Sequence, residues 1–375
     1  MRKSIGLFAM AGFAAMPFVS HAATPTIGDV LTASGITESG YLDGSYVASN
    51  RSNSAGSQND RGGLDGKTDS FSLNQAAITL AKQPAQGFGG LVNLILGTDA
   101  PAINGAYGTG GSDFNLTQAY LQYATGGWTL IGGRFVTLAG AEVINSTQDT
   151  NASRSLLFNY SIPLVHTGVR ATYKFNDMVS VVGGLNNSIT GAASDGNKQK
   201  TIEAGVMLTP SSTVNASLVE YYDTVSSSGG AVGFGASHHT SVTDLVASVQ
   251  ATKALAFVLN ADYTKLSVTA PGASVSAEKG VALYANYQFC DQLKGSLRGE
   301  YLKTATAYTG LASLSGGAAL SNIKEITYTV DYVAATNFDL LGEVRYDRAN
   351  TDIYGIAGSS SNSMGALELK ALYKF

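Results

Sequence analysis

The chain has 375 residues, of which only 13% are charged and 44% are hydrophobic, and it contains 44 glycines. The charged fraction is far below the ~25% of an average soluble domain, and a formal net charge of −4 argues against a nucleic-acid partner. Cys290 is the single cysteine, which excludes an internal disulfide.

Residues 1–22 have the layout of a secretory signal peptide. Arg2 and Lys3 form a basic start, an apolar run follows from Ile5 to Val19, and Ser20-His21-Ala22 offers small residues for cleavage. Removal of this segment leaves 21 basic and 27 acidic residues, a net charge of −6. After it, no apolar run reaches the ~18 residues that a membrane-spanning helix needs. We therefore expect an exported protein.

A short segment, residues 23–34, separates the signal peptide from the rest of the chain. Ile27, Val30 and Leu31 are spaced i, i+3 and i+4 after Thr26, a suitable N-cap, so the spacing predicts a short amphipathic helix. This helix would lie on the periplasmic side or inside the barrel inferred below, and an unstructured linker is the alternative. Residues 35–375 then form the remaining domain.

Residues 35–375 alternate between amphipathic segments and turn-rich connections. About 16 candidate strands have at least the roughly ten residues of a tilted transmembrane strand. They lie near 36–48, 70–83, 87–98, 113–124, 127–137, 164–175, 178–187, 199–209, 213–224, 240–252, 254–267, 279–290, 292–304, 323–335, 337–349 and 364–375. Short turns, such as Asn176-Asp177, alternate with long polar segments, such as 225–239. This pattern is typical of an all-β fold, the transmembrane antiparallel up-and-down β-barrel of an outer membrane.

The alternation within each strand predicts which side chains meet lipid. A charge at the lipid midplane costs about 2–4 kcal/mol for Arg or Lys, so charged residues are expected to face inward. On 127–137 this rule places Ile131 and Phe135 toward lipid and Arg134 inward. The inward-facing candidates for lining a channel are Arg134, His166, Arg170, Lys174, Lys294, Arg298, Glu300, Glu343 and Arg345.

A barrel of about 16 strands encloses a lumen too wide for side chains to fill, so we expect an aqueous channel. The inward charges would set a field across that channel and tune its ion selectivity. Alternatively, they pair with one another and merely keep the lumen wet. The sequence leaves both interpretations open.

The long connection 138–163 differs from the other loops, which are rich in Gly and Ser. It mixes apolar residues, such as Leu156 and Phe158, with the charged residues Glu142 and Arg154. Apolar side chains need a surface to cover them, and the inner wall of the barrel is the nearest one. We therefore expect the loop to fold inward and to place Glu142 and Arg154 at the narrowest part of the channel. A lid over the channel mouth is the alternative.

This part of the chain resembles the OmpL-like outer-membrane porins, also called β-barrel porin-2. The resemblance is carried by Gly133-Arg134-Phe135, Gly140 to Glu142, Ser153 to Phe158, and Pro163 with His166-Thr167-Gly168, and by the opening stretch Gly35-Ile36 to Tyr46. In the family an aromatic residue usually stands between Gly and Glu, where this chain has Ala141. The resemblance implies a pore in the outer membrane of a Gram-negative bacterium and names no solute.

The chain ends on Phe375, which shares one strand face with Leu367, Leu369, Ala371 and Tyr373. An aromatic C-terminus on an amphipathic last strand resembles the signal that bacterial outer-membrane barrels present to their assembly machinery. The expected partners are therefore that machinery, outer-membrane lipids and small hydrophilic solutes. A homo-oligomer is left open.

No catalytic or metal-binding set stands out in the sequence. His21 leaves with the signal peptide, His166 starts a strand, and His238-His239 are adjacent, so their side chains would point to opposite faces of a strand. We expect no enzyme activity, no cofactor and no bound metal. The favoured interpretation is a passive diffusion channel for small hydrophilic solutes and ions. A non-conducting adhesin or structural barrel and, less favoured, a barrel hydrolase are the alternatives.

Overall fold

The structure is a computed structural model, and it describes residues 27–51, 64, 68–103, 112–189, 198–225, 238–268, 275–303, 322–356 and 359–375. The chain divides into two compact units, Met1–Ile36 and Thr37–Phe375. The expected signal peptide, residues 1–22, lies outside the described residues. Its cleavage and the proposed domain boundaries remain predictions.

The first unit contains helix α1, Ile27–Ser34. Gly35 ends the helix with a φ of 70°, and the Ile36 N–H donates to the Leu31 carbonyl at 2.9 Å. Glycine is favoured there because other residues adopt a positive φ only at a cost. The sequence predicted a short helix at this place, whereas its expected N-cap, Thr26, lies outside the described residues.

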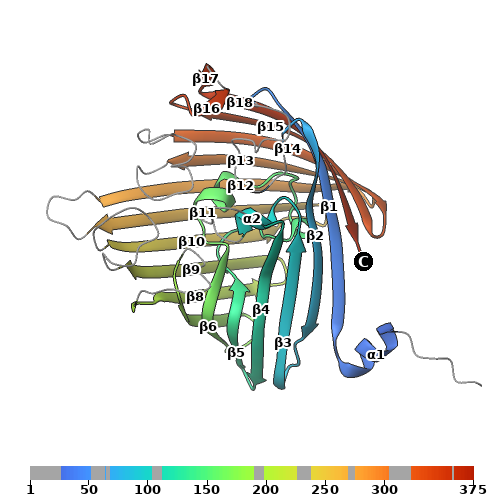
Figure 1. Cartoon of the computed structure of the whole chain (residues 1–375), viewed down its shortest axis with the longest axis vertical. Helices are drawn as coiled ribbons and strands as arrows, with labels where there is room; N and C mark the ends of the chain where they lie inside the picture. Colours follow the sequence, from blue (N-terminus) through green and yellow to red (C-terminus); the bar gives the residue numbers. More distant parts are fainter. Residues whose placement is uncertain are drawn as a thin grey trace, which may run out of the picture. The chain divides into compact units, whose positions relative to one another are not determined.

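The second unit is a closed barrel, in which sixteen strands of the described residues are each antiparallel to both neighbours (Figure 1). The strands are β1 (Thr37–Ser49), β2 (Ser70–Lys82), β3 (Gly87–Leu96), β4 (Phe114–Thr125), β5 (Trp128–Val136), β6 (Val165–Lys174), β7 (Val179–Asn186), β8 (Thr201–Ser211), β9 (Val214–Val225), β10 (His238–Gln250), β11 (Leu255–Val268), β12 (Val275–Cys290), β13 (Leu293–Lys303), β14 (Asn322–Ala335), β15 (Phe338–Ala349) and β18 (Ser363–Lys374). Strand β18 pairs with β1 and closes the ring. The predicted up-and-down barrel is confirmed.

The strand boundaries lie close to those read from the sequence. The largest shift is at β12, which begins at Val275 and not near 279. One feature was not expected: the segment 350–363, read as a polar loop, contains a small hairpin of β16 (Tyr354–Ile356) and β17 (Ser359–Ser361). This hairpin forms a sheet separate from the barrel.

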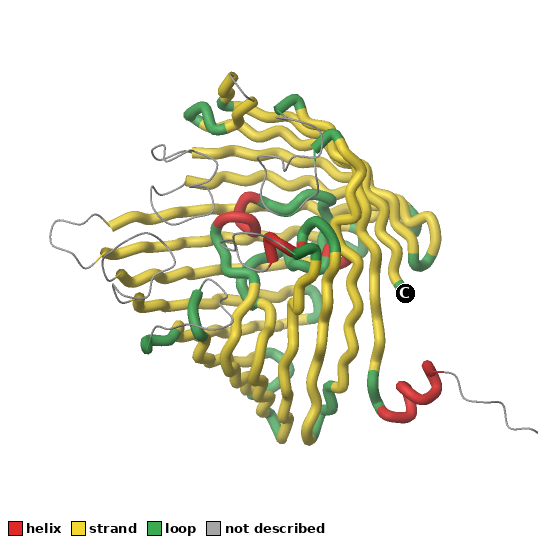
Figure 2. Tube along the Cα trace, viewed as in Figure 1, coloured by secondary structure: helices red, strands yellow, loops and turns green. Residues whose placement is uncertain are grey.

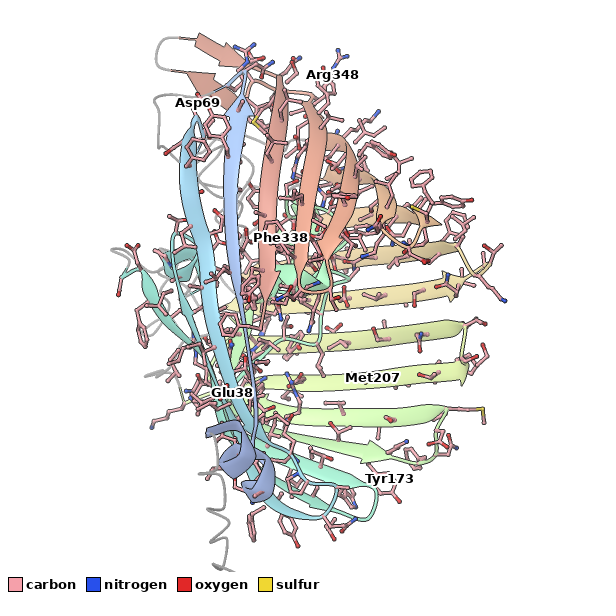
Figure 3. All side chains as sticks on the ribbon, turned by 90° about the vertical axis from the view of Figure 1, so that its right-hand side faces the viewer. Glu38, Asp69, Tyr173, Met207, Phe338 and Arg348 are labelled. Atoms are coloured by element: carbon pink, nitrogen blue, oxygen red, sulfur yellow. The ribbon has the colours of Figure 1, made fainter. Side chains whose placement is uncertain are left out.

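Side chains alternate between the two faces of the wall as expected for strands in lipid. On β18, Leu369 is 67% exposed on the outer face, whereas the adjacent Lys370 is 4% exposed on the inner face. Tyr173, near the short-turn end of β6, is paired with Trp128 of β5, and their ring centroids are 4.6 Å apart (Figure 3). Aromatic pairs of this kind suit the boundary between lipid and headgroups.

The hydrophobic core of the barrel lies between the barrel wall and segments that fold into the lumen. A ring of strands alone would leave the lumen without apolar side chains to pack against the wall. These segments contain α2 (Ala100–Ile103), the 3-10 helix η1 (Ser146–Gln148) and α3 (Leu156–Tyr160), and Figure 2 shows helical segments within the ring of strands. Within the described part of the chain, no helix is long and apolar enough to span a membrane.

Candidate functional site

The connection between β5 and β6, residues 137–164, folds into the lumen, and we call it the inward loop. Its Asn151 Nδ2 donates to Thr329 Oγ1 at 2.7 Å, on β14. Its Ala141 N–H donates to Asn260 Oδ1 at 3.1 Å, on β11. The loop therefore contacts separate parts of the wall. It lies against the inner surface, as its apolar residues predicted, and does not form a lid.

Apolar side chains fix the inward loop at two places. Leu156 and Leu157 of α3 pack in a buried cluster with Tyr284 and Leu302 on β12 and β13. Phe158 and Ile144 belong to a second cluster with Tyr41 on β1. Burial of a large apolar side chain contributes roughly 1.5–3 kcal/mol, so these contacts favour the docked loop.

Carboxylates of the wall accept hydrogen bonds from the loop backbone. Glu300 accepts from the N–H groups of Leu156 and Leu157, at 3.0 and 3.3 Å, at the start of α3. Glu343 accepts from the N–H groups of Ala152 and Ser153, at 2.8 and 3.2 Å. The first N–H groups of a helix have no partner within the helix, and a negative charge near them is favourable. The wall thus supplies the hydrogen-bond acceptors that these loop N–H groups lack within the loop itself.

Cations of the wall bind the carbonyl groups of the same stretch of the loop. Arg298 donates to the Ser153 carbonyl at 2.7 Å, and Arg345 donates to the Arg154 carbonyl at 2.7 Å. Lys370 donates to the Ala152 carbonyl at 2.6 Å. Three consecutive loop carbonyls are therefore held by three wall cations.

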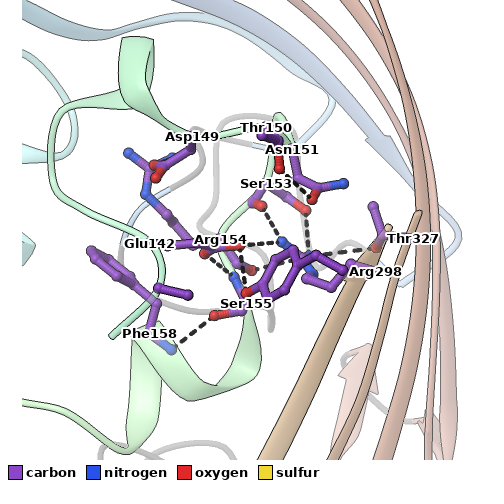
Figure 4. Close-up of polar contacts among 12 residues, drawn as sticks. Glu142, Asp149, Thr150, Asn151, Ser153, Arg154, Ser155, Phe158, Arg298 and Thr327 are labelled. Atoms are coloured by element: carbon purple, nitrogen blue, oxygen red, sulfur yellow. Dashed lines mark hydrogen bonds and ion pairs between the residues drawn. The ribbon is translucent and has the colours of Figure 1, made fainter. Parts of the chain in front are cut away.

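Arg298 joins the loop to the wall through charges as well (Figure 4). Its Nη1 lies 2.8 Å from Glu142 Oε1 in the loop, and its Nε lies 3.1 Å from Glu300 and 3.3 Å from Glu325. One guanidinium thus serves three carboxylates in a site with almost no solvent access. A buried ion pair is held only where each charge has partners, because burial of an unpaired charge is costly.

Glu142 and Arg154 were expected at a water-filled constriction, and the structure places both in protein contacts. Glu142 is 5% exposed and Arg154 is 1% exposed. Arg154 Nη1 lies 3.2 Å from Asp149, its Nη2 donates to the Ile144 carbonyl at 3.0 Å, and its guanidinium carbon lies 5.4 Å from the centroid of the Phe158 ring. In this structure the two side chains hold the inward loop together and do not face open water.

Arg298, Glu300, Glu343 and Arg345 are brought together around the inward loop, as described above, and all four are buried. Arg170 and His166 form a second group with Glu203. Arg170 Nη2 lies 2.8 Å from Glu203 Oε1, and Tyr221 Oη donates to the same oxygen at 3.0 Å. The His166 ring stacks on Tyr221 at a centroid distance of 4.6 Å.

Three expected lining residues stand apart from both groups. Lys174 lies at the end of β6 and pairs with Asp177 in the following turn at 2.7 Å. Lys294 pairs with Asp331 at 3.1 Å. Arg134 is half-buried on β5. Whether any of the eleven candidates lines a conducting path remains a prediction.

The expected orientation of Phe135 is wrong. Phe135 is 1% exposed, and the Arg170 guanidinium lies 4.3 Å from the centroid of its ring. On the same strand, Trp128 and Leu130 are the exposed residues. An aromatic ring is stable on the inner face here because the Arg170 guanidinium lies over it and the ring is almost inaccessible to water.

The sequence did not indicate Asp149 or Glu203 as parts of these groups, and it placed Lys370 on the water-facing side of the last strand without a role in holding the loop. The alternation on β8, where Glu203 falls between the exposed Ile202 and Ala204, could have placed it inside. Asp149 lies in the loop, where no periodicity applies. Burial raises the pKa of the Asp149 carboxyl to about 7, and the nearby Arg154 opposes this rise.

The described residues do not provide the ligand set of a metal site. Among the described residues, no group of three or more His, Cys, Asp or Glu side chains is placed to hold a metal ion.

One family model matches residues 35–375, and its description is "Putative beta-barrel porin-2, OmpL-like". A comparison with curated proteins finds no match. The matched segment spans the whole barrel.

Several solved outer-membrane structures share the fold. An anion-selective porin from Comamonas acidovorans has a TM-score of 0.62 at 12% identity, with 91% of this chain and 99% of that chain covered. The outer membrane channel DcaP of Acinetobacter baumannii has a TM-score of 0.60 at 14% identity, covering 91% and 97%. OmpT of Vibrio cholerae, in a trimer form, has a TM-score of 0.59 at 13% identity, covering 91% and 99%. At such low identity these likenesses bear on the fold alone.

Proposed function

The chain belongs to this family of OmpL-like β-barrel porins, and we propose that it is a passive diffusion channel for small hydrophilic solutes and ions. The supporting observation is the contrast between the two faces of the wall. The outer face carries apolar residues such as Leu297 and Ile326, whereas the inner face of the same strands carries Arg298 and Glu325. A polar inner face is suited to water and dissolved solutes.

The inward loop would narrow the channel. It crosses the lumen and is held by buried ion pairs and hydrogen bonds, so it is a fixed obstacle to a diffusing solute. The buried charges around Arg298 would then keep the loop in place, and selectivity would depend on charges that still reach solvent, such as Lys294. The sequence had instead predicted that Glu142 and Arg154 of the loop would be the selective charges.

Two alternatives receive less support. A non-conducting adhesin or structural barrel would not need the many inward charges. A barrel hydrolase would need an accessible nucleophile next to a base such as a histidine, and His166 is fully buried against Tyr221. We propose that the chain is not an enzyme.

We further propose the outer membrane of a Gram-negative bacterium as the location, with the short turns facing the periplasm. The exposed apolar belt would contact lipids, and the strand ending in Phe375 would engage the assembly machinery. Association into a homo-oligomer is also proposed, and the trimer form of the similarly folded Vibrio OmpT is compatible with it.

Conductance of the purified, folded protein in planar lipid bilayers tests the proposal. A porin should produce stepwise current increases in KCl that are stable at low voltage. Heat-modifiable migration on a gel would verify that the inserted protein is folded. Folded protein that inserts but gives no steps would refute the channel and favour a structural barrel.

A further inference from the structure

A polar cavity lies at the short-turn end of the barrel, next to the inward loop. It has a volume of about 420 Å³, and the loop segment 147–150 forms part of its lining. Its wall comes from strand ends and a turn that are distant in sequence, represented by Lys253, Lys294, Asp331, Asp339 and Lys374. A cavity of this size lies within the ~300–1,000 Å³ range of small-molecule sites.

The charge that this cavity presents to solvent is mainly positive. Lys294 is 45% exposed while its partner Asp331 is 17% exposed, at a separation of 3.1 Å. Lys374 is 39% exposed while its partner Asp339 is 8% exposed, at 2.6 Å. In both pairs the carboxylate lies deeper than the ammonium group, so the ammonium groups are the more accessible charges.

Lys253 adds a third positive charge. It lies in the turn between β10 and β11, its side chain is exposed, and no ion pair joins it to any residue in the described ranges. The remaining acid in the lining, Asp149, is directed to Arg154 in the loop, at 3.2 Å. An anion in the cavity would therefore meet three ammonium groups and only shielded carboxylates.

The rest of the lining carries amide and hydroxyl groups. Gln250 Nε2 donates to the Thr252 carbonyl at 2.7 Å, which leaves its side-chain oxygen as an acceptor. Gln288 likewise donates its Nε2 to a backbone carbonyl, that of Cys290. Thr147 and Thr150 contribute hydroxyl groups from the loop. Such groups exchange hydrogen bonds with the hydroxyls of a polar solute.

We infer that this cavity is a binding site for small hydroxylated organic acids. Its lysines would bind the carboxylate of the acid, and its side-chain amides would form hydrogen bonds with the hydroxyl groups. The inference rests on the proposed channel function and gives that channel a solute class. Solutes that pass the inward loop, or that approach from the turn side, would pause here. Lysine suits this task because its ammonium group is a mobile point charge with three donors.

The test uses planar bilayers with the full folded barrel and gluconate as the probe. Conductance in KCl is recorded first, because its absence would refute the channel itself and not only the site. Gluconate is then titrated, and sorbitol, its uncharged counterpart, is titrated in parallel. We expect gluconate to interrupt the current at millimolar concentration and sorbitol to interrupt it much less.

The variant K253Q/K294Q removes two of the three ammonium charges. The gluconate concentration that gives half-maximal block should rise about fivefold to tenfold, since exposed ion pairs contribute roughly 0.2–1 kcal/mol each. The matched control K265Q changes an exposed lysine on β11 that does not line the cavity, and its block should equal that of the parent.

Two results would overturn the inference: unchanged gluconate block in K253Q/K294Q, or equal block by sorbitol and gluconate in the parent. Heat-modifiable migration verifies that each variant is folded. Should the double variant not fold, K253Q alone provides the test, because Lys253 holds no ion pair in the described structure, and a smaller shift in the same direction is then required.

Discussion

Glu142 of the inward loop and Arg298 of β13 lie 2.8 Å apart, and both are buried. They are 156 positions apart in the chain, so their contact ties the loop to the far part of the wall. The same guanidinium also holds Glu300, Glu325 and the Ser153 carbonyl. Arg298 therefore links the inward loop to several buried groups of the wall at once.

Arg298→Gln should release the inward loop. Three buried carboxylates would lose a cationic partner, and removal of one partner of a buried pair costs about 3–5 kcal/mol. The peptide bond after Arg154, which is buried in the docked loop, should become a site of trypsin cleavage in the detergent-solubilised barrel. Single-channel conductance should increase at the same time.

The control for this experiment is Lys324→Gln, which changes an exposed residue on β14. It should leave both cleavage and conductance as in the parent. If Arg298→Gln resists trypsin as well as the parent does, the loop is held by its apolar contacts and the charges are dispensable.

Glu343→Gln should weaken the loop locally. Glu343 accepts from the Ala152 and Ser153 N–H groups and from the Thr329 hydroxyl, at 2.8, 3.2 and 2.7 Å. An amide keeps one acceptor oxygen, and loss of a charged acceptor costs about 1–3 kcal/mol. Hydrogen exchange followed by mass spectrometry should show faster exchange in the peptide around residues 151–154. Glu38→Gln, an exposed change on β1, should not alter it, and protection as in the parent would refute the role of Glu343.

Arg154→Glu distinguishes the buried site from the constriction expected from the sequence. A charge at an open constriction would shift the reversal potential under a salt gradient and leave the conductance nearly unchanged. In the buried site the new carboxylate would face Asp149, so the loop should undock and the conductance should rise. A pure selectivity change would show that Arg154 faces the channel in the membrane.

The sequence predicted the barrel, the strand limits and the inward loop, because each depends on a local signal. Alternation places Leu369 outside and Lys370 inside whatever the rest of the chain does. The environment of Arg154 depends instead on contacts with Asp149, Ile144 and Phe158. These contacts form because the loop bends, and a loop has no sequence periodicity from which its bends could be predicted. Likewise, Phe135 was placed outside because alternation set it opposite its neighbour Arg134, which was expected to face inward. In the structure Phe135 is on the inner face, where Arg170 covers its ring.

Docking of the inward loop should depend on pH through Asp149. Burial raises the pKa of this carboxyl to about 7 from its ordinary value of 3.8. A group whose pKa is higher in the docked state stabilises that state at low pH, and this contribution falls as pH rises from about 4 to above 7. Current fluctuations in planar bilayers should therefore increase between pH 5 and pH 8.

Asp149→Asn removes this titration and should flatten the pH dependence. Asp177→Asn is the matched control, because the fully exposed Asp177 lies in the turn after β6, where the Lys174 ammonium lowers its pKa. It should leave the pH dependence as in the parent. An unchanged pH profile in Asp149→Asn would assign the effect to other groups.

The seam that closes the barrel should tolerate no side chain at Gly40. Gly40 and Phe375 exchange both backbone hydrogen bonds, at 2.8 and 2.9 Å, and the Phe375 ring lies over the glycine. A Cβ at Gly40 would overlap that ring and lie 2.8 Å from the Ala77 carbonyl oxygen. Overpacking of this kind costs about 1–3 kcal/mol. Gly40→Ala should therefore lower the folded fraction, measured by heat-modifiable migration.

A double-mutant cycle separates the ring contact from a general effect on the strand. Phe375→Ala alone should also lower the folded fraction, because the seam loses an apolar contact and the last outward residue. In the Phe375→Ala background, Gly40→Ala should cost less than in the parent, since part of the overlap is gone. Gly44→Ala, on the same strand with its nearest neighbour at 3.5 Å, should be nearly neutral. If the two substitutions lower the folded fraction additively, Phe375 does not act through its contact with Gly40. Its effect would then lie in the assembly of the barrel and not in the closed seam.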